Sequence, residues 1–476
     1  MNGIAPDNAP PAKSAAMRSF EAQWQDRDRD ALMAVREHAM RSFVALGLPT
    51  TREESWRYTN LRQLATRSFV GAAGVGRPAG TAPGTAASVA PAATLAWLGD
   101  AAQMHAIVLV NGVPWLPDSG GAVAGLALSS LREMTRRDAD LLGRRLAQLP
   151  GAEPQRWGLL NTALFTDGLH ISVGARLSAP LLLLHVTAAK GANEIAHPRV
   201  IIDVAAGCSA TIIEHHGAVE HHGPVEHHGP VAHRGHAEAA GADGALCNSA
   251  TQIALAGRAE IEHYRIFAAD AGATHIDTLD IRQAQSSRCR QFTLALGGGL
   301  VRTTLEAHLD EADAELDSFA LLVGHESRHV DCVNIARHNA RDTRSRQTAR
   351  AIASGTSRVV FNSKVVVNAG AVHADSLQSC RGLLLSPSAE IDSRPQLEIH
   401  TDEVKCAHGS STGRLDEAML FYLLSRGIDR TTAQSLLVYA FLADVLSGMS
   451  EAHIRAATET ALIAQLPNQQ ILREFR

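Results

Sequence analysis

The chain has 476 residues, a formal net charge of −5 at pH 7 and a sequence pI of about 6.5. It lacks the clustered basic excess that phosphate binding requires, which argues against a broad nucleic-acid surface. The length is sufficient for two or three domains with a sizeable core.

The cysteines fit neither a disulfide framework nor a zinc finger. They show no CxxC pair and no compact metal-ligand spacing, and they are Cys208, Cys247, Cys289, Cys332, Cys380 and Cys406. Free thiols in a reducing cytoplasm are the simplest interpretation. We find no apolar signal-peptide region before Met17 and no run of ~18 uncharged apolar residues. We therefore expect a cytoplasmic protein that neither follows conventional secretion nor spans a membrane.

The first third of the chain predicts a mostly helical or mixed N-terminal domain, residues 1–175. Apolar residues recur at helical spacing over 14–46. The predicted stripe consists of Leu32, Val35, His38, Ala39 and Phe43. Ala, Gly and Pro dominate residues 71–94, which predicts a linker or long loop. An apolar run at 107–110 and a helical stretch through Leu131 and Leu142 follow.

Beyond about Pro180 the sequence changes to short apolar or alternating runs. Each has the length of a strand, and they are 181–186, 200–204, 211–213, 253–255, 292–296, 359–361, 365–367 and 383–385. Long helical patterns are almost absent between them. This argues against a doubly wound α/β sheet and leaves a β-sandwich or a β-solenoid. No short repeat in the sequence decides between these two.

A His-rich tract interrupts the strand pattern. Residues 214–231 repeat Glu-His-His-Gly-Ala/Pro-Val three times, and the tract ends near 244. We interpret 214–244 as an expanded loop between two strands, because repeated Gly and Pro fix no coordination geometry. Imidazoles still bind divalent metals, so weak adventitious binding is the second interpretation. Its candidate ligands are His215, His216, His221, His222, His227 and His228.

The last part of the chain becomes helical again. A first helix is expected after Gly413, with Thr412 as N-cap and Gly427 beyond its end. Its apolar stripe is Leu415, Ala418, Met419, Tyr422 and Leu423. A second helix is expected to begin at the capping box 431–434. Its predicted buried face is Ala433, Leu436, Leu437, Ala440 and Phe441. A third helix is expected over 450–466.

Cys406 and His408 are the main candidate for site chemistry. They alternate in an extended segment, so their side chains would leave one face of a strand about 7 Å apart. A thiol and an imidazole so placed could share a soft metal ion or a sulfur species. The alternative is a structural cysteine beside an incidental histidine. For a second group, His329, Asp331 and His338, a hydrogen-bonded solenoid turn is favoured over a metal or acid-base cluster.

Motifs of several enzyme classes are absent. There is no phosphate-binding loop ending in Gly-Lys-Ser/Thr, so we do not expect ATP hydrolysis by this chain. Neither an HExxH helix nor a GxSxG nucleophile elbow occurs.

The sequence around Cys406 resembles that of a known family. Residues 397–409, followed by 415–417 and 421–427, resemble the C-terminal signature of SufD-like scaffold proteins in the SufB/SufD family of the SUF iron-sulfur cluster assembly system. Residues 53–61 and 160–168 resemble N-terminal elements of the same family. The resemblance implies a mainly β fold. It places a right-handed parallel β-helix at 176–410, flanked by the N-terminal domain and a C-terminal helical region at 411–476.

The same resemblance implies a non-catalytic scaffold. It would pair with a SufB-like subunit and bind the SufC ATPase through its C-terminal helices. His408, and less strongly Cys406, would meet transient iron or a nascent iron-sulfur cluster at the SufB interface. No tightly bound cofactor is expected in the isolated chain, and neither a nucleic-acid nor a membrane partner is expected. Whether the isolated chain forms a homodimer stays open.

Two alternatives remain. A SufB-like scaffold would carry the nascent cluster itself. The sequences at 405–409 and 421–423 argue against a SufB-like chain, as does the lack of a Cys-rich N-terminal motif. A β-helix carbohydrate-active enzyme would need aromatic platforms for sugars, and only 4% of the residues are aromatic. Asn362, Thr401 and Ser410-Ser411 depart from the family pattern and put fine geometry in doubt.

Overall fold

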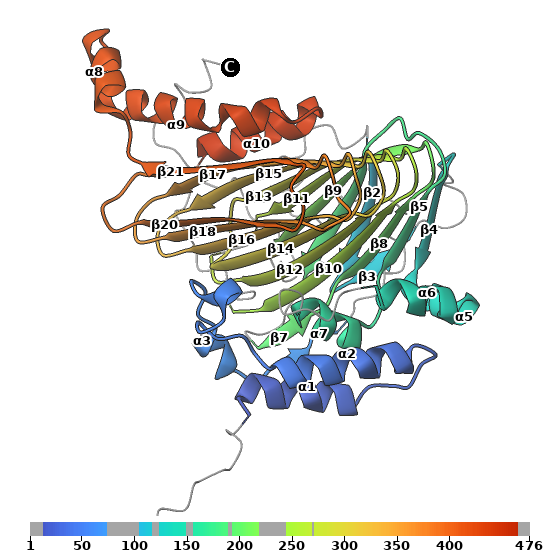
Figure 1. The fold of residues 1–476 in the computed structure, drawn as a ribbon. Helices are drawn as coiled ribbons and strands as arrows, with labels where there is room; N and C mark the ends of the chain where they lie inside the picture. Colours follow the sequence, from blue (N-terminus) through green and yellow to red (C-terminus); the bar gives the residue numbers. More distant parts are fainter. Residues whose placement is uncertain are drawn as a thin grey trace, which may run out of the picture.

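The computed structural model describes residues 13–73, 104–116, 123–148, 156–188, 193–218, 244–268 and 271–464. Two long sheets of mostly parallel strands wind into one β-helix, with helices from both ends of the chain packed on its outer faces (Figure 1). This confirms the expected mainly β fold class. Most of the predicted linker, residues 74–94, lies outside the described residues.

Successive strands alternate between the two sheets, so that each coil supplies one strand to each. The first sheet contains, in spatial order, β4 (Leu126–Ser130), β5 (Leu169–Val173), β8 (Arg199–Val204), β10 (Leu246–Leu255), β12 (Thr274–Gln283), β14 (Leu300–Leu309), β16 (His329–His338), β18 (Arg358–Val367) and β20 (Glu390–Ile399). The short strands β1 (Val70–Gly71) and β7 (Glu194–Ala196) pair beside β10.

The second sheet faces the first across the interior of the β-helix. It contains, in spatial order, β3 (Val113–Trp115), β2 (His105–Val110), β6 (Leu181–Thr187), β9 (Ser209–Ala218), β11 (Glu260–Phe267), β13 (Arg288–Ala295), β15 (Glu315–Gly324), β17 (Arg344–Ala353), β19 (Asp375–Leu384) and β21 (Lys405–Gly413). Only the pairs β2–β3 and β4–β5 are antiparallel within the described sheets.

Strand register shows a coil of about 29 residues. Leu300 pairs with His329, and His329 pairs with Arg358. Tight corners that follow strands of the first sheet use residues in the left-handed region, which are Arg258, Ser286, Asp313 and Asp342. The predicted strands 359–361 and 365–367 are parts of one strand, β18, which pairs along its whole length with β16 and β20.

The N-terminal helices cover the outer face of the first sheet. They are α1 (Ala15–Gln25), α2 (Met33–Leu46), the short 3-10 helix η1 (Glu54–Trp56), α3 (Arg62–Ala65), α5 (Leu131–Arg137), α6 (Ala139–Leu146) and α7 (Arg156–Leu164). Phe43 and Trp157 share an apolar cluster with Ile276 of β12. The predicted stripe is partly wrong: His38 is exposed, and Arg36 is buried instead. The Arg36 guanidinium donates to backbone carbonyls at the end of α7, and its Nε forms an ion pair with Asp30 at 3.0 Å that balances its charge.

The C-terminal helices are α8 (Glu417–Ser425), α9 (Arg430–Ser447) and α10 (Ala452–Ala464). Helices α9 and α10 lie along the outer face of the second sheet (Figure 1), where Val438 and Leu442 join an apolar cluster with Leu294. The predicted face of α9 is partly wrong, because Ala433 is buried but Ala440 is exposed. Packing against the sheet decides which side of α9 is buried. The apolar periodicity of the helix alone does not show how the helix is rotated about its own axis.

Two predicted helix caps are also wrong. Helix α8 begins after Asp416, whose side chain accepts from the backbone of Ala418 and Met419, while Thr412 lies within β21. Helix α9 begins after Asp429, which caps Thr432 in the same way. An aspartate binds free amides at a helix start through a charged oxygen, which also favours the positive end of the helix dipole. Among the described helices, none is long and apolar enough to cross a membrane.

Candidate functional sites

The β-helix ends in an uncovered pair of strands. β20 closes the first sheet and β21 closes the second, and in the part of the chain that the structure describes neither has a strand on its outer side. An unpaired strand presents free backbone donors and acceptors to any strand that approaches it. We call this end, made by β20 and β21, the mouth of the β-helix (Figure 1).

Cys406 and His408 both lie on β21 and point to the inner face of the mouth. Their register partners on β19 are Ser376 and Gln378, which are buried inside the β-helix. Cys406 is half-buried against the interior apolar core, whereas His408 is exposed. Burial raises the pKa of the Cys406 thiol, so the thiol stays protonated at neutral pH until a metal ion displaces its proton. The structure thus places both side chains on one face, as their alternation predicted.

His408 ends a column of polar side chains that runs through the interior along the second sheet. Each member pairs in register with the next, and the column consists of His263, Gln291, Ser318, Gln347, Gln378 and His408. All members except His408 are buried. Sequence reasoning missed this column, because its members stand one coil apart. A search for polar residues recurring at about 29 positions in strand-like runs would find it.

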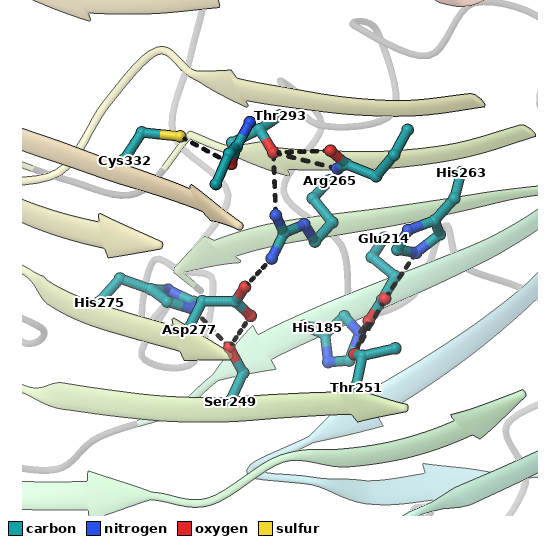
Figure 2. Close-up of polar contacts among 12 residues, drawn as sticks. His185, Glu214, Ser249, Thr251, His263, Arg265, His275, Asp277, Thr293 and Cys332 are labelled. Atoms are coloured by element: carbon teal, nitrogen blue, oxygen red, sulfur yellow. Dashed lines mark hydrogen bonds and ion pairs between the residues drawn. The ribbon is translucent and has the colours of Figure 1, made fainter. Parts of the chain in front are cut away.

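A buried carboxylate, Glu214 of β9, organises the middle of the interior (Figure 2). His185 Nε2 lies 2.9 Å from one carboxylate oxygen and His263 Nε2 lies 2.8 Å from the other. The Thr251 hydroxyl donates across the interior from β10 at 3.0 Å. Burial alone raises the pKa of this carboxyl, but the bonds from His185 and His263 outweigh burial and hold the pKa well below its usual value. Glu214 is therefore ionised, and both imidazoles donate to it.

A second buried network surrounds Asp277 of β12 (Figure 2). Arg265 forms an ion pair with one oxygen, and the Ser249 hydroxyl donates to the other at 2.5 Å. Ser249 also contacts His275 Nε2 at 2.9 Å. Burial raises the pKa of Asp277, while Arg265 opposes that rise. Sequence reasoning did not single out these residues, since they come from strands far apart in the chain.

The structure corrects the start of the His-rich insertion. Strand β9 continues to Ala218, so Glu214, His215 and His216 belong to the β-helix and are buried. Successive side chains of a strand point to opposite faces, so His215 and His216 cannot share one ion as neighbours in a loop could. The other candidate ligands, His221, His222, His227 and His228, lie outside the described residues.

The His329, Asp331 and His338 group divides into two hydrogen-bonded networks, as favoured from the sequence. Asp331 accepts from Thr59 and pairs with Arg302, while His329 Nε2 lies 2.9 Å from the Thr59 hydroxyl. His338 contacts the Thr343 hydroxyl of the next corner and the Ser345 hydroxyl of β17 with its two ring nitrogens, each at 2.8 Å. These side chains tie the N-terminal segment and the corners to the β-helix.

Helix α8 carries an exposed apolar surface. It extends beyond the strands that α9 and α10 cover (Figure 1), and Leu420 is its buried residue. Met419, Phe421 and Tyr422 have 59%, 72% and 57% of their surface exposed. Large apolar side chains grouped on one protruding helix are typical of a protein-binding surface.

Comparison with protein families decides the membership of this chain. The model of the core domain described as "SUF system FeS cluster assembly, SufBD core domain" matches residues 185–441. The model of the SufBD protein N-terminal region matches residues 17–72. The chain belongs to the SufBD family. It is an assembly subunit of the SUF iron-sulfur cluster system.

Individual relatives agree with this membership. The chain is similar to the iron-sulfur cluster assembly protein SufD of Escherichia coli, with 28% identity over 94% of this chain and 95% of the relative. It is also similar to a SufBD family protein of Synechocystis, with 26% identity over 90% of this chain and 89% of the relative. A shorter match to SufD of Bacillus subtilis has 41% identity over 18% of this chain and 20% of the relative.

Proposed function

We propose that this SufBD family chain acts as a SufD-like, non-catalytic scaffold that pairs through the mouth of its β-helix with a SufB-like subunit. The observation that carries the proposal is the position of Cys406 and His408 on the inner face of the last strand, where both sheets end unpaired. A partner with two similar terminal strands would satisfy both edges. It would also cover the partly exposed Ile399 at the end of β20.

His408 is the stronger of the two proposed contacts for transient iron or a nascent cluster, which is cargo here. Imidazole is the commonest side-chain metal ligand, and the exposed ring of His408 lies where an incoming ion can reach it. Cys406 needs a bound metal to lose its proton, since burial raises its pKa. The two residues therefore differ in how readily they could accept iron.

The test of this role uses cells in which a variant is the only copy of the gene. We expect His408→Ala to leave the SUF complex assembled and to abolish cluster maturation, with a milder effect from Cys406→Ser. The matched control is His400→Ala, because His400 is also exposed, lies just beyond β20 and contacts Glu398 at 3.1 Å. Normal maturation with His408→Ala would contradict the ligand role.

We further propose that α8 is the surface that binds the SufC-like ATPase. Removing all residues after Gly413, the simplest truncation, is a poor test, because α9 and α10 cover the apolar outer face of the second sheet. The sharper change is Met419→Ser with Phe421→Ser, which leaves that cover in place. In a pull-down we expect at least a tenfold loss of ATPase binding, as for central interface residues. Leu141→Ser, at an exposed leucine of α6, is the control. Undiminished binding by the α8 double variant would move the interface elsewhere.

The SufB-like alternative makes a different prediction. A SufB-like chain would itself retain a cluster when produced with the ATPase alone, whereas a SufD-like chain would need a second β-helix subunit. Co-purification from the native cell separates the two, because the SufD-like role requires recovery of both an ATPase and another SufBD protein.

A further inference from the structure

The imidazole of His216 is buried and makes no hydrogen bond to any described residue. Only 2% of its surface is exposed, and within the part of the chain that the structure describes neither ring nitrogen has a hydrogen-bond partner. Its ring stacks between His185 and Phe267 with centroid distances of 4.3 and 4.9 Å. Leaving one buried polar group unpaired costs about 1–3 kcal/mol. Two unpaired nitrogens on one buried ring therefore require an explanation. A bound ion is one explanation, because it would give a ring nitrogen a partner.

The neighbours of His216 are metal ligands by type. One ligand atom each from His185, Glu214 and His216 lies within 4.8 Å of the other two. A second group, His216, His275 and Asp277, meets the same distance. Both groups combine two imidazoles with one carboxylate, a set that suits iron(II), zinc and related first-row ions.

Charge favours the group around Glu214 over the group around Asp277. Asp277 already pairs with the Arg265 guanidinium, which would repel a cation. Other buried carboxylates of the β-helix are matched in the same way: Asp331 pairs with Arg302, and Glu306 with Arg337. Among the described residues, the hydrogen-bond partners of Glu214 are instead His185, His263 and Thr251, and none of these is an arginine or a lysine. A divalent ion would give this fully buried carboxylate the positive charge that an arginine gives the others.

We propose that His185, Glu214 and His216 form a site for one resident first-row divalent metal ion inside the β-helix. The three residues come from the neighbouring strands β6 and β9, in which His185 and His216 are register partners. In the second sheet β9 stands six strands before β21, about 29 Å away at the usual strand spacing. The site is therefore separate from the mouth and its cargo. It departs from the sequence-based expectation that the isolated chain holds no tightly bound cofactor.

The test measures retention of zinc by the full-length chain. The protein is unfolded with chelator, refolded with Zn(II) and passed over a chelating resin, which strips ions held by surface histidines. We expect about one zinc per chain to remain in the wild type and none in His216→Phe, whose ring keeps the stack while losing both nitrogens. The matched control is His338→Gln. His338 is equally buried but has hydroxyl partners at both nitrogens, so this variant should retain the ion.

A second measurement does not depend on the folding of a variant. Anomalous diffraction at the zinc edge from wild-type crystals grown from the refolded protein should give a peak within bonding distance of all three residues. No retained zinc in the wild type, undiminished retention in His216→Phe, or a peak only at other residues would each overturn the proposal.

Discussion

Similar polar side chains are buried in the interior of this β-helix and exposed at its mouth. Around Glu214, polar groups have no access to solvent, and the stacked coils supply donors from both sheets. At the mouth, His408 continues the same polar column, but the next coil is missing and the side chain is exposed. Around Glu214, each coil therefore supplies hydrogen-bond partners to the coil beside it. The polar side chains of the last coil can instead bind another molecule.

This comparison predicts that changes in the interior reduce stability while changes at the mouth reduce function. The first group of variants should alter the free energy of unfolding strongly, and the second should scarcely change it. Equal effects on stability at the two places would contradict the distinction.

The largest expected effect is that of Glu214→Ala. Removing the carboxylate leaves His185, His263 and Thr251 with buried donors that have lost their acceptor, so we expect a loss of about 3–5 kcal/mol in the free energy of unfolding. Glu214→Gln should cost less, about 1–3 kcal/mol, since its amide oxygen still accepts. Denaturant titration in the presence of chelator measures both without a metal contribution.

The control for this pair is Glu37→Ala. Glu37 is an exposed carboxylate that faces Arg41 one helical turn away, so its loss should change stability by no more than about 0.5 kcal/mol. A cost at Glu214 as small as the cost at Glu37 would mean that the interior network does not stabilise the fold.

The second expected effect is a loss of stability in mild acid. Burial lowers the pKa of His197 to about 3 and that of His338 to about 4. In the unfolded chain both return to about 6.5, so the unfolded state binds more protons below that pH and becomes favoured. Between pH 6.5 and 5.5 each histidine should remove about 1 kcal/mol of stability. Denaturant titrations at both pH values measure the change. His338→Gln should show a shallower pH dependence than the wild type, and an unchanged slope would assign the effect to other groups.

The sequence predicted the layout of this fold better than its interior. Helical periodicity placed α2, α8, α9 and α10 correctly, because amphipathic spacing is local. The β-helix itself came from the resemblance around Cys406, since periodicity alone left a sandwich open. The ten-residue strand β18, which has a polar centre, was predicted as two short runs, 359–361 and 365–367. Within the polar centre of β18, Lys364 pairs with Glu398 of the next coil, and that information is one coil away in the sequence.

The candidate site was likewise predicted in part from the sequence. Alternation alone predicted that Cys406 and His408 share a face, and the register on β19 agrees. The network of Glu214, His263 and Asp277 could not be predicted, because it joins strands across the interior. Repetition in the His-rich tract also obscured the boundary of β9, whose last residues share the composition of the insertion that follows.

A smaller effect is expected from replacing residues 219–243 by a short Gly/Ser linker. The cost of closing a flexible loop changes slowly with its length, so the free energy of unfolding should change by about 1 kcal/mol or less. The residues kept include Glu214 and His216, whose removal would instead disturb the interior. Thermal unfolding of the full chain and of the shortened chain gives the comparison. A much larger loss would show that the tract stabilises the β-helix.

The smallest effect on stability should be that of His408→Ala. Its side chain is exposed and no neighbouring coil holds it, so the free energy of unfolding should change by less than about 0.5 kcal/mol. Gln378→Ala, one coil further in, removes a buried member of the same polar column and should cost more. Parallel denaturant titrations of the two variants measure this contrast directly. If His408→Ala were the more destabilising change, the histidine would act as a structural residue of the last coil, and its proposed role toward iron would lose its physical basis.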